Sequence, residues 1–333
     1  MFGDRYHERM STTLIDSVRS RRLAAPLVGY PAVSYTGTTV RTAITDATAQ
    51  AEALLAYFRA ARPDVLFPFM DLSVEAEAMG LPVRFKEMDS PDVTEHPVKR
   101  ADDLCSITRP NPEHAGRLPV YLEVIRRLIA ETDALVGGYA ASPFTVAGLL
   151  MSAEELAMNT MLEPELCHSV LEVAAEVSVS YVQAQEAAGA HLVVLLDPTA
   201  ALLSPELYEQ FAGPYVRRVI ESVSIPVVLH VCGQTTRLIP SFVKDPVAGL
   251  SLDSEVDLPA IAPGVPEQVI LMGNIAPVDT MLNGTPDAIR AEVRALMEAM
   301  SARDSFVPST GCDVPPGTPR ENLEAFPAAV REP

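Results

Sequence analysis

The sequence predicts a single (β/α)₈ barrel of the TIM type over residues 1–333, with a helical N-terminal extension, residues 1–24, before the first strand. Eight short apolar runs alternate with amphipathic helical stretches, a pattern typical of parallel strands joined by crossover helices. No low-complexity tract or flexible linker divides the chain. No strand is followed by the glycine-rich loop G-x-G-x-x-G, which disfavours the competing doubly wound sheet.

Each predicted strand is a short run rich in branched apolar residues. In chain order the runs are 25–33, 64–69, 134–139, 191–197, 225–231, 248–253, 268–274 and 305–310. Between them, the clearest helical patterns occupy 46–61, 153–188, 204–223 and 285–300. The stretch from about 84 to 118, rich in Pro, Asp and Glu, predicts an elaborated loop after the second strand, where long loops are often functional.

Composition limits the environments and partners that we expect. The chain is 48% hydrophobic and 21% charged, with a mean hydropathy of +0.16, as expected for a globular protein. A net charge of −19 repels nucleic acid and anionic membrane surfaces, so neither is expected as a partner. The first residues lack the apolar core of a signal peptide, and no uncharged run reaches the ~18 residues of a membrane span, which predicts a cytoplasmic protein.

A candidate metal site lies at the ends of two predicted strands. His230 and Cys232 end the fifth strand, and Cys312 follows the eighth, 80 positions further along. Residues two apart on a strand share a side, and in a barrel both strand ends open on the same face. One imidazole and two thiolates suit Zn²⁺, with a fourth position open for a substrate. The alternative is a buried histidine with two buried cysteines, which are common in protein cores.

Four carboxylates are candidates for catalytic roles. Asp71 and Glu75 follow the second strand four residues apart, so they could share one helical face and orient a ligand, bind zinc or accept a proton. A solvated helical turn is the alternative for this pair. Asp197 and Asp253 each end a strand near the barrel mouth, although a carboxylate there can also be only a helix cap.

Other polar residues have weaker signals. Asn274 and Ser309 lie at strand ends and are candidates for contacts to a substrate. Cys105 and Cys167 have no partner at metal spacing, so we expect them to be structural or incidental.

Several motifs resemble one known family along most of the chain. HVCGQTTRLIP, LDSEVDL, LMGNIAPVDTMLNGTPDAI and STGCDVPPGTPRENLEAF resemble, in that order, the C-terminal half of the uroporphyrinogen decarboxylase superfamily. They are most similar to its zinc-dependent branch, the methylcobamide:coenzyme M methyltransferases, as are FPFMDLSVEAEAMG and SPFTVAGLLMS. The resemblance covers roughly residues 10–328. It implies that the zinc signature of this branch falls on His230, Cys232 and Cys312.

The resemblance also separates two branches of the family. Decarboxylases carry an Arg-rich loop after the first strand that pairs with the carboxylates of a tetrapyrrole. The equivalent stretch here is GYPAVSYTGTT, with no arginine before Arg41, so the substrate anchor of that branch is missing. The resemblance therefore implies an enzyme that transfers a methyl group from a methylated corrinoid, as in methylcobalamin, to a thiol such as coenzyme M.

This implied reaction gives zinc a definite role. An alkyl thiol with a pKa near 8.5 is mostly protonated at pH 7, and coordination to zinc turns it into the nucleophilic thiolate. Because the barrel accounts for all 333 residues, the corrinoid must come on a separate protein. Three alternatives stay open: another thiol or a folate as acceptor, a tetrapyrrole decarboxylase, and a non-catalytic barrel that binds a corrinoid or tetrapyrrole.

Overall fold

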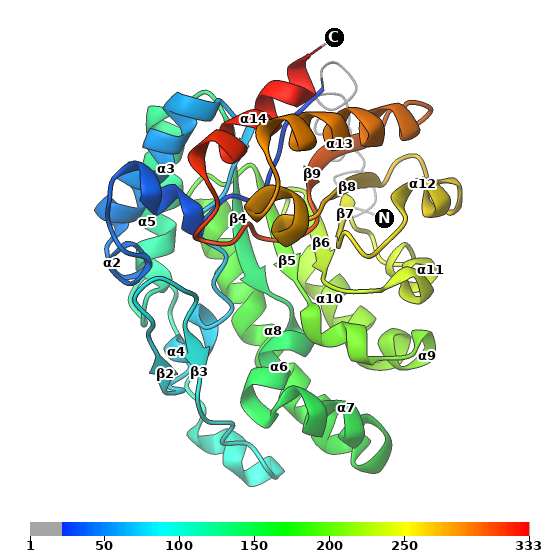
Figure 1. Ribbon diagram of the computed structural model, residues 1–333. Helices are drawn as coiled ribbons and strands as arrows, with labels where there is room; N and C mark the ends of the chain where they lie inside the picture. The colour runs from blue at the N-terminus through cyan, green and yellow to red at the C-terminus, as the bar shows by residue number, and fades with distance from the viewer. Residues whose placement is uncertain (1–21, 333) are drawn as a thin grey trace.

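A curled sheet of seven parallel strands forms the centre of the computed structural model, which describes residues 22–332 (Figure 1). The strands lie side by side in the order β1 (Val65–Leu66), β4 (Leu135–Ala141), β5 (Leu192–Leu196), β6 (Val227–Val231), β7 (Gly249–Leu252), β8 (Ile270–Ile275) and β9 (Phe306–Thr310). Every neighbouring pair is parallel. Seven of the eight predicted strands are therefore confirmed, and the fold is the predicted α/β barrel.

The predicted first strand, 25–33, is wrong as a regular strand, although its first half closes the barrel. The Ala25 amide donates to the Pro308 carbonyl of β9 (3.1 Å), and the Asp64 amide before β1 donates to the Ala24 carbonyl (2.9 Å). The extended segment 22–28 thus lies between the first and last strands of the sheet. Two prolines in the predicted run have no amide hydrogen to donate to a ladder, and the chain turns into a 3₁₀ helix at Tyr30.

Helices cover the outside of the barrel. The α-helices are α2 (Val40–Thr45), α3 (Ala47–Ala61), α4 (Val74–Ala78), α5 (Leu118–Glu131), α6 (Pro143–Met151), α7 (Ala153–Leu162), α8 (Pro164–Ala187), α9 (Pro205–Leu207), α10 (Gly213–Ile220), α11 (Ile239–Phe242), α12 (Leu258–Ile261), α13 (Pro286–Ala299) and α14 (Arg320–Arg331). The shorter helical turns are η1 (Tyr30–Tyr35), η2 (Ala101–Ser106), η3 (Pro198–Leu202), η4 (Tyr208–Ala212), η5 (Thr236–Leu238), η6 (Ala262–Gly264) and η7 (Pro277–Leu282).

Two predicted helices depart from a single regular α-helix. The predicted helix 153–188 divides into α7 and α8 at Glu163, because Pro164 lacks an amide hydrogen and disfavours a helical residue before it. The stretch 204–223 is divided into α9, a π-helical turn and α10, with Pro214 at the start of α10. The helical extension predicted for residues 1–24 lies outside the described residues, apart from 22–24, which are extended.

The loop predicted after the second strand is a composite segment. It contains a short antiparallel hairpin of β2 (Val83–Arg84) and β3 (Asp92–Val93), followed by η2. Figure 1 shows this hairpin on the same side of the barrel as α6 and α7, to which the carboxyl ends of the strands point. The segment therefore borders the mouth of the barrel, where TIM barrels carry their active sites.

Apolar side chains fill the inside of the barrel. They come from the closing segment and from strands β1, β4, β5, β6, β8 and β9, and they are Leu23, Ala25, Leu27, Val65, Phe67, Tyr139, Leu192, Val194, Leu196, Val228, Ile270, Met272 and Val307. The barrel is thus a packed core, so only the mouth can receive a substrate. Within residues 22–332, no helix combines the length and the apolar character needed to cross a bilayer.

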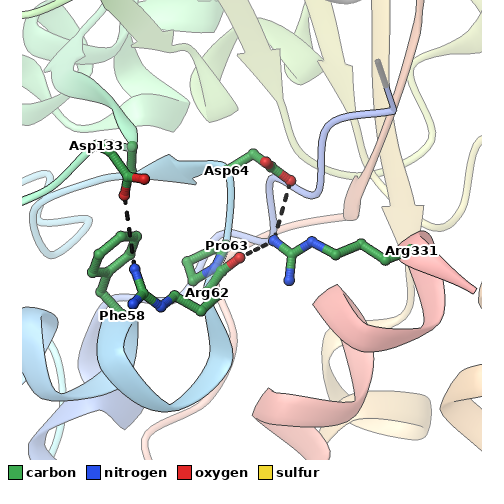
Figure 2. Close-up of a pocket in the computed structure, with 7 residues that line it drawn as sticks. Phe58, Arg62, Pro63, Asp64, Asp133 and Arg331 are labelled. Carbon is green, nitrogen blue, oxygen red and sulfur yellow. Dashed lines mark hydrogen bonds and ion pairs between the residues drawn. The ribbon is translucent and has the colours of Figure 1, made fainter.

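The opposite end of the barrel is held by ion pairs. Arg331 of α14 contacts the Arg62 carbonyl and lies 3.4 Å from the Asp64 carboxylate, and Arg62 lies 3.8 Å from Asp133 (Figure 2). These residues line a small pocket of about 110 Å³. Because they tie the last helix to the start of β1 and have charged partners, they stabilise the fold rather than form a second binding site.

Candidate metal centre

The three predicted metal ligands converge at the barrel mouth. The Cys232 sulfur lies 3.3 Å from His230 Nε2 and 3.4 Å from the Cys312 sulfur, and Cys312 lies 3.6 Å from His230 Nε2. His230 is buried at the end of β6, while both cysteines follow strands and are partly exposed. In the described part of the chain, these are the residues whose ligand atoms cluster closely enough to hold a metal ion.

The spacing of these atoms fits a tetrahedral ion. With about 2.3 Å to sulfur and about 2.0–2.1 Å to nitrogen, Zn²⁺ keeps its ligand atoms about 3.5–3.8 Å apart. The observed distances of 3.3–3.6 Å are slightly shorter, so a small outward movement would accommodate the ion. The cluster contains one imidazole and two sulfurs and no carboxylate, which leaves one tetrahedral position without a protein ligand.

Neighbouring groups set the orientation of the histidine and the ionisation of the thiols. The hydroxyl of Ser251 on β7 lies 3.0 Å from His230 Nδ1, so Nε2 faces the sulfurs. The hydrogen bond between the two thiols lowers the pKa of Cys232, whereas the same bond and burial raise the pKa of Cys312. The ionisation of one thiol is therefore coupled to that of the other.

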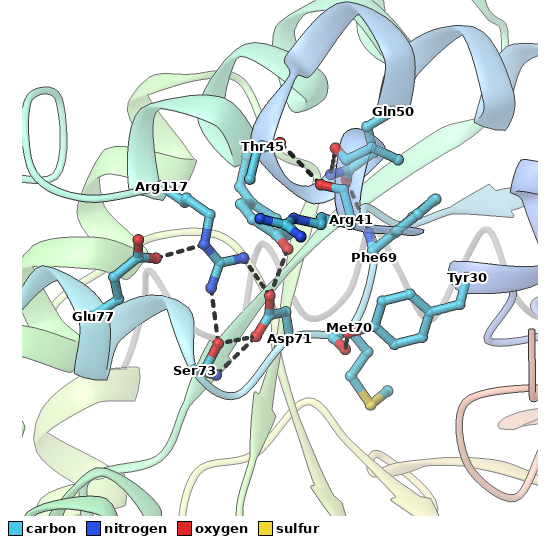
Figure 3. Close-up of polar contacts among 12 residues, drawn as sticks. Tyr30, Arg41, Thr45, Gln50, Phe69, Met70, Asp71, Ser73, Glu77 and Arg117 are labelled. Atoms are coloured by element: carbon cyan, nitrogen blue, oxygen red, sulfur yellow. Dashed lines mark hydrogen bonds and ion pairs between the residues drawn. The ribbon is translucent and has the colours of Figure 1, made fainter. Parts of the chain in front are cut away.

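Asp71 is held by a dense network of donors. Its carboxylate accepts hydrogen bonds from Arg117 (2.5 Å), from the Tyr121 hydroxyl (3.0 Å) and from both the amide and the hydroxyl of Ser73 (2.9 and 2.6 Å). Figure 3 shows the Arg117 guanidinium directed toward Asp71, Ser73 and Glu77 at once. Because Asp71 and Arg117 are both buried, a solvated turn is the wrong description of this segment.

Glu75 is also buried, but in a different setting. The helix α4 begins at Val74, so the predicted shared helical face with Asp71 is wrong. Glu75 Oε1 accepts a hydrogen bond from the Ala141 amide at the end of β4 (2.7 Å). Burial raises the pKa of Glu75 to about 7, although the Ala141 amide opposes this shift.

Asp197 links two neighbouring strand ends. Its carboxylate accepts hydrogen bonds from the hydroxyls of Ser142 (2.9 Å) and Thr145 (2.8 Å), which follow β4. Burial raises its pKa to about 6, and the two hydroxyls partly offset that effect. The side chain does not cap η3, so the helix-cap alternative is wrong for this residue.

Asp253 and Asn274 support the loop beside the metal centre. Asp253 accepts a hydrogen bond from the Gly233 amide (2.9 Å), next to Cys232, where Gly233 has a φ of 77°. The Asn274 amide donates to the carbonyls of Asp253 (2.9 Å) and Val256 (2.6 Å). Both side chains therefore position backbone near the ligands.

The contacts of Ser309 and of the two remaining cysteines do not involve the candidate metal ligands. The buried Ser309 hydroxyl donates to the Ala25 carbonyl (2.7 Å), which helps to close the barrel. Cys167 is buried in α8, with its thiol 3.7 Å from the Leu156 carbonyl, and Cys105 is exposed in η2.

Several residues of the site carried no sequence motif. Arg117 lies at the end of a predicted loop, where nothing indicates a buried ion pair. Ser251 has a usable signal, because it is two residues before Asp253 on a strand and must share its side.

The fold and the three converging ligands define an α/β-barrel protein with a candidate metal centre at its mouth. The chain belongs to the uroporphyrinogen decarboxylase (URO-D) family, which matches residues 21–333. The matched region includes all the candidate site residues. The resemblance of the sequence motifs to this family is thereby confirmed.

Two kinds of relative occur within the family. A methylated-thiol:coenzyme M methyltransferase of Methanosarcina mazei is 32% identical over 270 residues, which span 80% of this chain and 71% of that protein. The methylcobamide:CoM methyltransferase MtbA of the same organism is 28% identical over 268 residues, or 78% of this chain and 77% of that one. A uroporphyrinogen decarboxylase of Synechococcus sp. is 29% identical over 282 residues, or 81% and 78%.

A solved structure supports the methyltransferase side of the family. A methyltransferase from Methanosarcina mazei superposes with a TM-score of 0.86 at 27% identity, covering 96% of this chain and 98% of that one. The similarity therefore extends over nearly the whole fold.

Proposed function

We propose that this protein is a zinc-dependent methyltransferase that moves a methyl group from a methylated corrinoid to a thiol such as coenzyme M. The observation that carries the proposal is the convergence of His230, Cys232 and Cys312 with one tetrahedral position open. Relatives named as coenzyme M methyltransferases support it. Uroporphyrinogen decarboxylase is the second candidate, because relatives with that name are nearly as similar.

The residues at and around the metal centre would have different roles. His230, Cys232 and Cys312 would hold Zn²⁺, and Ser251 would keep the His230 ring in the orientation that directs Nε2 to the ion. Bound zinc supplies Lewis acidity that deprotonates a thiol near neutral pH. Asp253 and Asn274 would hold the loop after β6 so that Cys232 keeps its place.

The buried carboxylates would act on the shape of the mouth. Asp71 has its lone pairs occupied by Arg117, Tyr121 and Ser73, so we assign it to positioning the loop after β1. Glu75 and Asp197 join neighbouring strand ends through their hydrogen bonds and would have the same kind of role. The substrate proton would leave to solvent, because both cysteines are partly exposed.

Metal analysis tests the centre. Purified wild-type protein should hold one zinc per chain, and Cys232→Ala and Cys312→Ala should hold almost none. A matched control, Cys167→Ala, removes a buried thiol outside the cluster and should leave the zinc content unchanged. Equal metal in all four proteins would contradict the ligand assignment.

Substrate assays test the reaction. The protein should demethylate methylcobalamin when supplied with a thiol, and it should not convert uroporphyrinogen. Binding of the thiol should release about one proton near pH 7, measured by calorimetry in two buffers of different ionisation enthalpy. Formation of coproporphyrinogen without methyl transfer would instead identify a decarboxylase.

The partner would be a separate corrinoid protein that docks over the barrel mouth. Among the described residues, the exposed large apolar side chains all lie on segments that follow the carboxyl ends of strands. They are Met88, Met158, Met161, Leu162, Leu202 and Val278. Three of them form one face of α7, on the mouth side of the barrel (Figure 1). An exposed apolar patch beside an active site suits a protein partner.

Variants of α7 test this docking surface. Met161→Glu with Leu162→Glu should slow methyl transfer from a methylated corrinoid protein, while transfer from free methylcobalamin stays unchanged. The control is Ala328→Glu, an exposed position of α14 away from α7 in Figure 1. Equal loss with both donors would mean that α7 affects the site itself rather than the partner.

A further inference from the structure

The outer face of α7 is apolar and uncovered. Met158, Met161 and Leu162 lie three and four positions apart on this helix, so they share one face, and they are 56%, 77% and 73% exposed. The opposite face carries the buried Leu156 and Thr160 and packs against α6 and α8. Large apolar side chains gathered on one exposed face indicate a surface that another molecule covers.

Acidic side chains border this apolar face. Glu154 lies one helical turn before Met158 on the same face of α7, and Glu163 and Glu165 follow α7 at its junction with α8. All three glutamates are exposed, and no lysine or arginine among residues 22–332 forms an ion pair with them. The apolar face and these acids together form a surface that we call the α7 surface: Glu154, Met158, Met161, Leu162, Glu163 and Glu165.

The surrounding stretch of chain has no positive charge of its own. Residues 128–216 contain twelve Asp and Glu and no Lys or Arg, and they include α6, α7, α8 and α9. Bases from other segments pair with some of these acids, as Lys99 does with Glu155 (2.6 Å) and Arg218 with Glu172 (2.6 Å). The acids of the α7 surface are among those that no such base reaches, so their charges are available to a partner.

The charge of the α7 surface limits what can cover it. Nucleic acid or an anionic membrane would bring phosphates against the three glutamates. A second copy of this chain, docked through the same face, would bring the same glutamates, and the net charge of −19 opposes such a pairing. A protein with basic side chains is the occupant that the charge favours, because opposite charges across an interface speed encounter and fix register.

We propose that the α7 surface docks a protein whose contact face carries lysines or arginines around an apolar centre. The apolar side chains of α7 would bury against that centre, and the three glutamates would pair with the bases at the rim of the interface. In the proposed methyl transfer this protein is the corrinoid protein. The identity of the partner thus rests on the proposed function, whereas the charge of its contact face follows from the α7 surface alone.

A peptide of defined charge tests the surface directly. The probe is a dansylated amphipathic helix made of Leu and Lys, and its counterpart has Glu in place of every Lys. In fluorescence anisotropy the Leu–Lys peptide should bind the full-length protein, and its affinity should fall severalfold between about 50 and about 200 mM salt, because salt screens exposed ion pairs. The Leu–Glu peptide should bind at least about tenfold more weakly.

Two variants with the same change in net charge assign this binding to the α7 surface. The first neutralises the three glutamates of the α7 surface and should weaken the Leu–Lys peptide about tenfold. The control neutralises three exposed glutamates of α3, α5 and α13 and should keep the wild-type affinity. The substitutions are Glu154→Gln, Glu163→Gln and Glu165→Gln in the first variant, and Glu52→Gln, Glu131→Gln and Glu298→Gln in the control.

A third variant tests the apolar part separately. Met161→Ser with Leu162→Ser should weaken the Leu–Lys peptide at least about tenfold, because less apolar area is buried, and it should leave the relative effect of salt unchanged. Both side chains are exposed, so the fold should be retained, which circular dichroism checks. A photo-crosslinker on the peptide should label wild-type protein within residues 153–165.

The outcomes separate this inference from the proposed function, because peptide binding needs neither zinc nor a methyl donor. A protein that binds the Leu–Lys peptide at the α7 surface but methylates no thiol would refute the reaction and leave the docking surface in place. Equal weakening in the two glutamine variants would overturn the inference, since binding would then follow net charge alone. Tighter binding of the Leu–Glu peptide, or a dimer that dissociates in Met161→Ser with Leu162→Ser, would overturn it too.

Discussion

The polar side chains in the two halves of the barrel mouth differ in their hydrogen-bond partners. On the side of β6 and β9, His230, Cys232 and Cys312 face one another, and their ligand atoms have few other partners. On the side of β1 and β5, the carboxylates of Asp71 and Asp197 are surrounded by donors. The sulfurs and Nε2 of the candidate metal ligands contact one another, whereas the carboxylates of Asp71 and Asp197 have several donors from other residues. Position at a strand end alone does not distinguish these two arrangements.

The largest expected effect concerns the half of the mouth near β1 and β5, where the buried carboxylates are surrounded by donors. Arg117→Ala leaves the buried Asp71 carboxylate without its charged partner, so we expect a loss of about 3–5 kcal/mol in the free energy of unfolding. Zinc content should be retained in the fraction that folds. Chemical denaturation measures the loss, with Arg109→Ala as control, because the Arg109–Glu176 pair is exposed and should contribute less than about 1 kcal/mol. A similar loss of stability in both variants would show that the burial of the Asp71–Arg117 pair is not the reason for the loss.

Glu75 should make stability depend on pH. Its pKa is about 7 in the folded protein, against about 4.3 in an unfolded chain. Because the folded state keeps a proton that the unfolded chain releases, the free energy of unfolding falls as the pH rises through this window. Relative to pH 4, Glu75→Gln should gain up to about 3 kcal/mol over wild type at pH 8. Denaturation curves at several pH values measure this difference; a constant difference would contradict the raised pKa.

A variant of Ser251 tests the half of the mouth that contains the candidate metal ligands. Ser251→Ala removes the hydrogen bond to His230 Nδ1, so we expect zinc affinity to fall about 10–100-fold. Competition with a chromophoric chelator measures the affinity. Ser142→Ala is the matched control, because its hydroxyl donates to Asp197 in the half near β1 and β5 and should not influence zinc. Equal changes in the two variants would mean that the halves are not independent.

The smallest effect concerns Ser309. Ser309→Ala removes a buried hydrogen bond to the Ala25 carbonyl, and we expect a loss of about 1 kcal/mol in stability. The zinc content and the affinity for thiols should stay at wild-type values. Thermal unfolding and calorimetry check both parts. A marked loss of thiol affinity would instead return Ser309 to the substrate contacts predicted from its position.

The sequence alone determined the strand-helix alternation and the three metal-ligand candidates. Apolar runs separated by amphipathic stretches locate β4 to β9, because each pattern depends only on local periodicity. His230 and Cys232 are two residues apart, and Cys312 follows another strand, so the barrel rule is enough to bring them together. The closing segment was only partly predictable, since an apolar run does not show that its prolines exclude it from a regular ladder.

Only the tertiary structure decided which polar residues are already paired. The partners of Asp71 are Ser73, Arg117 and Tyr121, and the latter two are 46 and 50 positions away along the chain. No local pattern records such a contact, because hydrogen bonding and burial depend on which segments the barrel brings together.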